Sequence, residues 1–74
     1  MSVPVTLHVR TESYVDKSID GNKVIGEVKR GDEILHTKSV ITDDFIESVC
    51  DAQDNIALDI ELWAVKNTDF MPTA

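Results

Sequence analysis

Residues 43–65 read DDFIESVCDAQDNIALDIELWAV, and this stretch decides the fold because its apolar residues fit two different periods. Apolar residues recur at helical spacing along it, at Phe45, Val49, Ala52, Ile56, Ile60 and Trp63. Residues 56–62 also place an apolar side chain at every even position, which is the period of a strand with one buried face. The same residues therefore support both a helix and a strand.

The dipeptide Asp54-Asn55 favours the strand interpretation, because Asp and Asn are common in turns and this pair falls in the middle of the run. We predict two strands, over residues 45–52 and 56–65, joined at this dipeptide. A short helix within residues 43–52 is the alternative. Thr42-Asp43-Asp44, with Glu47 shortly after, has the composition of a helix N-cap.

The N-terminal half shows clearer strand patterns. Residues 3–10 carry Val or Leu at every odd position, and Pro4, which cannot donate to a ladder, places the start of this strand at a sheet edge. The polar stretch 11–22 ends in Asp-Gly-Asn and is expected to form a long loop with a turn.

Two further strands are expected over residues 23–29 and 33–41, which are rich in β-branched residues. Arg30-Gly31-Asp32 separates them as a tight turn. Five short strands in one 74-residue chain predict a single all-β domain, residues 1–74, folded as a small five-stranded barrel. With the helix within residues 43–52, the class becomes α+β.

Three motifs occur in a familiar order: Leu7-His8-Val9-Arg10, the run Val24-Ile25-Gly26-Glu27-Val28-Lys29-Arg30-Gly31-Asp32, and the ending Trp63-Ala64-Val65 with Phe70-Met71. In this order and spacing the chain resembles the bacterial SH3 domain family. That family usually has asparagine where His8 stands and glycine where Leu62 stands, and residues 38–59 match none of its motifs.

The resemblance implies an SH3-like barrel that binds a ligand. In the family, ligand contacts come from the loop after the first strand and from aromatic residues near the closing strand. The residues expected at the binding site are therefore Tyr14, Trp63 and Phe70, with Asp16 and Asp20 of the acidic loop. Cell-wall or peptidoglycan binding is the role most often implied by the family and is the alternative function.

The charge balance restricts the class of partner. Seven basic and fourteen acidic residues give a net charge of -7, which repels nucleic acid and anionic lipid surfaces. A protein partner with a basic surface, or a second copy of the chain, is expected instead. Neither a signal peptide nor a membrane helix is apparent, and the lone Cys50 fits a reducing compartment, so a cytoplasmic protein is expected.

Residues suited to metal binding or catalysis are present but are not arranged in a specific motif. Asp16 to Gly21 with Glu27 has the ligand spacing of a calcium loop, yet its flanks resemble strands and not helices. Cys50, expected to be buried and inert, has only His8 and His36 as candidate bases or zinc co-ligands. We expect no enzyme activity, cofactor or metal, but a binding module that serves as an accessory, assembly or inhibitory protein, including one encoded by a phage.

Overall fold

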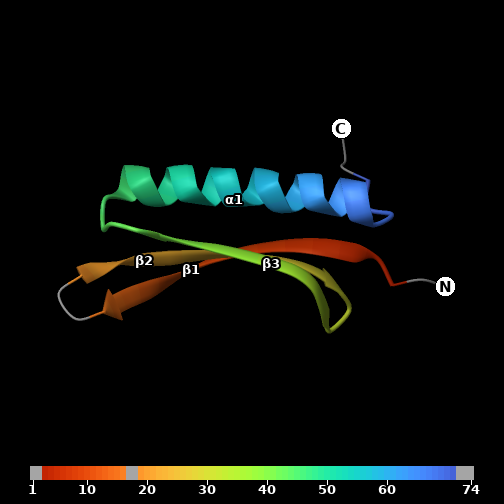
Figure 1. The fold of residues 1–74 in the computed structure, drawn as a ribbon, viewed down its shortest axis with the longest axis horizontal. Helices are drawn as coiled ribbons and strands as arrows, with labels where there is room; N and C mark the ends of the chain where they lie inside the picture. The colour runs from red at the N-terminus through yellow and green to blue at the C-terminus, as the bar shows by residue number, and fades with distance from the viewer. Residues whose placement is uncertain (1–2, 17–18, 72–74) are drawn as a thin grey trace.

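A three-stranded antiparallel sheet carries one long helix on one of its faces (Figure 1). The computed structural model describes residues 3–16 and 19–71, without the side chains of Asp16 and Ile19. The elements are β1 (Val5–Asp16), β2 (Ile19–Arg30), β3 (Glu33–Thr42) and α1 (Ile46–Asn67). The strands are ordered β1-β2-β3, so both β1 and β3 are edge strands.

The predicted five-stranded barrel is therefore wrong: the described residues form an open sheet and not a closed one. The α+β alternative describes the chain better, although its helix is longer than the short one considered within residues 43–52. Helix α1 also includes the residues that were predicted to form a strand over 56–65.

The helix forms because four buried residues, Ala52, Ile56, Ile60 and Ala64, are spaced four apart and fall on one side of it. Leu58 and Leu62 lie on its other side, 55% and 50% exposed. The alternating pattern of residues 56–62 thus arises from two opposite faces of one helix. The turn predicted at Asp54-Asn55 does not form, since both residues lie within the helix on exposed positions.

The polar residues before the helix locate its beginning to within a few residues. The N-cap position is Phe45, whose backbone is extended and whose side chain makes no capping hydrogen bond. The Phe45 N–H instead donates to Asp43 Oδ1 at 3.1 Å, and Glu47 lies in the first turn, where its charge interacts favourably with the helix dipole. Residues 42–44 therefore lie just before the helix, but none of them is its N-cap residue.

The predicted loop over residues 11–22 is also wrong, because β1 and β2 pair through most of it. Tyr14 lies opposite Gly21, and Asp16 lies opposite Ile19. The turn predicted at Asp20-Gly21-Asn22 is therefore wrong, since these three residues lie in β2. Gly21 has a different role, since a Cβ there would overlap with the carbonyl oxygen of Thr42. The supposed calcium loop is accordingly a β-hairpin, and the side chain of Asp16 lies outside the described residues.

The turn between β2 and β3 and the strands beside it are confirmed. Gly31 adopts a φ of 63°, a left-handed conformation that glycine accepts without steric cost. Strand β3 matches the predicted range of 33–41 to within one residue. The sequence signals were reliable where a tight turn separates two alternating segments.

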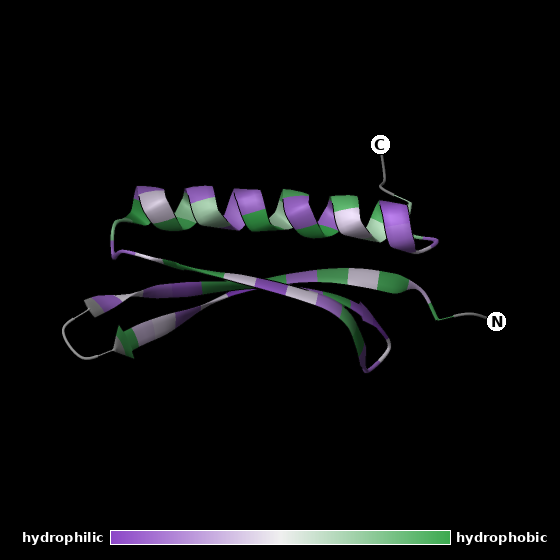
Figure 2. Cartoon of the chain, in the orientation of Figure 1, coloured by the Kyte–Doolittle hydropathy of each residue, from purple (hydrophilic) through white to green (hydrophobic). Residues whose placement is uncertain are grey.

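The core lies between α1 and the face of the sheet that the helix covers. Hydrophobic residues line both sides of this interface (Figure 2). Val24 and Val28 of β2 are fully buried against Ile56 and Ile60 of α1. Gly26 lies between the two valines, and a Cβ at this position would overlap with the Cγ2 atom of Ile56. The missing side chain allows the helix to lie close to the sheet.

We expect Gly26→Ala to lower the free energy of unfolding by about 1–3 kcal/mol, because the added methyl overpacks a filled interface. Urea unfolding followed by circular dichroism measures this loss. The Gly26→Ala, Ile56→Ala double variant should lose less stability than the sum of the losses of the two single variants, because the shortened side chain at position 56 makes room for the added methyl. Strict additivity of the two losses would contradict the close approach.

Candidate functional site

The residues expected at the binding site lie at two ends of an elongated molecule. Tyr14 and Asp20 are at the hairpin end of β1 and β2, whereas Trp63 and Phe70 lie toward the opposite end of α1 (Figure 1). The longest dimension of the molecule is 48 Å. The structure therefore brings Trp63 and Phe70 to the same end but does not bring Tyr14 or Asp20 to them.

Both Trp63 and Phe70 are partly buried and pack against the core. The indole of Trp63 also stacks on the imidazole of His36, with ring centroids 4.5 Å apart and planes inclined by 6°. The stack joins α1 to the edge strand β3. Part of the exposed apolar surface expected of Trp63 is therefore used in a contact within the chain.

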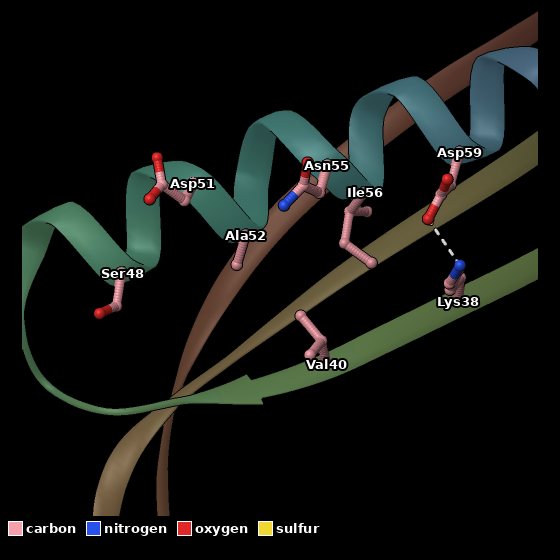
Figure 3. Close-up of a pocket in the computed structure, with 8 residues that line it drawn as sticks. All are labelled: Lys38, Val40, Ser48, Asp51, Ala52, Asn55, Ile56 and Asp59. Carbon is pink, nitrogen blue, oxygen red and sulfur yellow. Dashed lines mark hydrogen bonds and ion pairs between the residues drawn. The ribbon is translucent and has the colours of Figure 1, made fainter.

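A groove runs beside this stack, between β3 and α1 (Figure 3). Its volume is about 400 Å³. The apolar part of its lining is supplied by Val40, Ala52 and Ile56. The polar part consists of Lys38, Ser48, Asp51, Asn55 and Asp59.

Acidic side chains dominate the charge of the groove. Lys38 Nζ donates to Asp59 Oδ2 at 2.5 Å across it, but both side chains are about half exposed, so the pair adds little stability and is screened by salt. Asp51 is exposed and has no hydrogen-bond or ion-pair partner among the described residues. One carboxylate of the groove is thus available to a cation from another molecule.

The strand that borders the groove has a free edge. β3 pairs with β2 on one side only, and its outer backbone groups face no other strand of the described chain. Val40, on the groove side of this strand, is 41% exposed. The groove therefore combines unpaired backbone groups, an apolar surface and a free carboxylate in one place.

The open face of the sheet has a different character, with both signs of charge in contact. Arg10 forms one ion pair with Glu12 of its own strand and another with Glu27 of β2. Hydrogen bonds to Glu12 and then Glu27 raise the pKa of Arg10 above its ordinary value. Because these charges are already paired, this face offers less to a charged partner than the groove does.

One expectation about a reactive group can be compared with the structure. Cys50 is exposed on α1, so the expectation that it is buried was wrong. Within the described residues, no three His, Cys, Asp or Glu side chains lie close enough together to hold a metal ion. Among the same described residues, no helix is both long enough and apolar enough to cross a membrane.

Sequence reasoning missed the groove because the residues of α1 that line it were divided between two predicted strands, over residues 45–52 and 56–65, and the turn between them. The signal that could have found it is the helical spacing of Ala52 and Ile56, with Ser48, Asp51, Asn55 and Asp59 along the flank of the same helix. The residues of β3 could not be assigned to the groove until the position of α1 was known.

No protein-family model, no curated protein and no solved structure matches this chain. The resemblance to the bacterial SH3 family therefore stays a hypothesis that these comparisons do not test.

The stack of His36 on Trp63 can be tested with the chain's only tryptophan as the reporter. We expect His36→Ala to lower the free energy of unfolding by about 1 kcal/mol, because the aromatic contact is lost. His36→Phe should restore most of that loss, since a second aromatic ring can stack in its place. Urea unfolding followed by Trp63 fluorescence measures both values, and equal stability of the Ala and Phe variants would contradict the role of the stack.

Proposed function

We propose that this chain is a non-catalytic binding module that docks a protein partner with a basic surface in the groove between β3 and α1. The observation that carries the proposal is the unpartnered Asp51 beside the exposed side chain of Val40. An apolar surface supplies affinity when it is covered, and a nearby charge selects the partner.

The distribution of charge on α1 supports a basic partner. The helix carries five acidic residues, Glu47, Asp51, Asp54, Asp59 and Glu61, and one basic residue, Lys66. Together with the net charge of -7, this field attracts cationic surfaces and repels phosphate backbones and anionic lipids. Nucleic acid and membrane surfaces are therefore not part of the proposal.

The proposal includes an accessory, assembly or inhibitory role in the cytoplasm. An exposed, unpaired thiol such as that of Cys50 is easier to maintain in a reducing compartment. Cell-wall binding is less well supported, because many cell walls are anionic and the exposed side of α1 is acidic. Tyr14, Asp20 and Trp63 are not among the residues that line the groove, although Trp63 follows the lining residue Asp59 by one helical turn.

Affinity capture from the organism that makes this protein tests the proposal. We expect the wild-type chain to retain a stoichiometric protein in low salt and to release it as salt rises, because screening weakens the ionic contact. Asp51→Lys should reduce the captured amount at least tenfold. Asp54→Lys, an identical charge change on the outer side of the same helix, should reduce it less than threefold.

Mass spectrometry of the captured fraction measures both variants, and circular dichroism confirms that each is folded. Equal retention by the Asp51→Lys and Asp54→Lys variants would show that docking does not use the groove. The absence of any stoichiometric protein from the wild-type sample would contradict the proposal itself.

A further inference from the structure

We infer that the groove takes an extended segment of the partner, which adds as a fourth strand to the free edge of β3 and places a basic and an apolar side chain under α1. This inference rests on the proposed function and specifies the mode of docking. In strand addition, main-chain hydrogen bonds to a sheet edge give affinity, and pockets for alternate side chains give selectivity.

The edge of β3 is suited to this pairing because little protects it. Natural edge strands are often blocked by proline or by charged side chains that point outward. Glu33 is the first residue of β3, Lys38 is the only other charged one, and the strand contains no proline. Lys38 Nζ donates to Asp59 of α1, so its ammonium group lies toward the helix. Val40 and Ile41, on opposite faces of the strand, remain 41% and 50% exposed.

The dimensions of the groove define the length of segment that it can hold. β3 and α1 run in opposite directions along it (Figure 3). A strand advances roughly 3.3 Å per residue and a helix roughly 1.5 Å, so two residues of β3 span about four residues of α1. Because Lys38 contacts Asp59, Val40 lies near the level of residue 55 and Thr42 near the level of residue 51. The groove therefore accommodates about five extended residues.

These levels also define which side chains fit. A residue added beside Val40 would face Val40, Ala52 and Ile56, so an apolar side chain is favoured there. The next residue on the same face lies two positions along, near the level of Asp51, where a Lys or Arg side chain would meet an unpartnered carboxylate. The segment is thus expected to carry an apolar residue and a basic residue two positions apart.

A second copy of this chain is a poorer occupant than a basic segment of another protein. Pairing two β3 strands would bring a second Asp51 and a second Asp59 to the groove, with only one additional Lys38. Each copy also carries a net charge of -7, so the two acidic helices would repel one another. Charge complementarity therefore favours a cationic partner.

The peptide Thr-Arg-Thr-Val-Thr-Arg-Thr is a suitable probe, because its symmetry presents an Arg two residues from Val in either strand direction. Titration into isotopically labelled protein should shift the amide signals of β3 and of the groove side of α1. We expect Asp51→Lys to weaken binding at least tenfold and Asp54→Lys to change it less than threefold. Replacing both Arg residues by Glu should abolish the shifts.

Two N-methylated forms of the probe test strand addition separately from charge. Successive N–H groups of a strand point to opposite edges, so one form is methylated at the Thr residues and the other at the Arg and Val residues. We expect one form to bind at least tenfold more weakly than the other, because its methyl groups block pairing with β3.

The failure of this inference can be distinguished from the failure of the proposed function. Equal binding of the two methylated forms, or shifts that spare β3, would overturn strand addition even if Asp51-dependent capture of a partner succeeds. A sedimentation experiment that shows a dimer, with β3 amides protected from exchange only in the dimer, would identify a second copy as the occupant and would also overturn the inference. Loss of Asp51-dependent capture would instead overturn the proposed function.

Discussion

The packing of Ile56 and Ile60 against β2 at Gly26 is the interaction on which the rest of the structure depends. Without the helix, the apolar face of the three-stranded sheet would be exposed to water. Without the sheet, the apolar side of the helix would be exposed in the same way. The glycine lets these two elements approach closely enough to exclude water from Val24 and Val28. Among the described residues, most of the buried hydrophobic side chains belong to this interface, so it supplies most of the core.

The same interface explains where the candidate site lies. Helix α1 packs on all three strands, and two side-chain interactions join it to β3: the stack of Trp63 on His36 and the ion pair of Asp59 with Lys38. Between these two contacts and residues 43–45, which connect β3 to α1, the helix covers the edge strand only in part. The groove lies in this uncovered region. A single helix on a three-stranded sheet thus leaves an apolar margin beside an unpaired edge.

The turn at Gly31 and the strand after it could be predicted from the sequence, because they depend on local conformational preferences, whereas the loop expected over residues 11–22 is largely paired strand. The C-terminal half could not be predicted. Leu58 and Leu62 are exposed on the outer side of α1, and together with Ile56 and Ile60 they imitate the alternation of a strand. The burial of Ile56 and Ile60 against the sheet favours the helix, and that tertiary contact was not known from the sequence, so the groove that depends on α1 was also missed. The expected site at Tyr14 and Trp63 assumed a closed barrel, and the open sheet separates those residues.

The most direct measurement compares the free energy of unfolding of the Ile60→Ala and Leu58→Ala variants in urea. Ile60 is fully buried against the sheet and Leu58 lies on the opposite face of the helix. The account predicts a loss of about 2–5 kcal/mol for Ile60→Ala and a change within about 0.5 kcal/mol for Leu58→Ala. In a strand, both residues would share one buried face, so equal large losses would contradict the packing of α1 on β2.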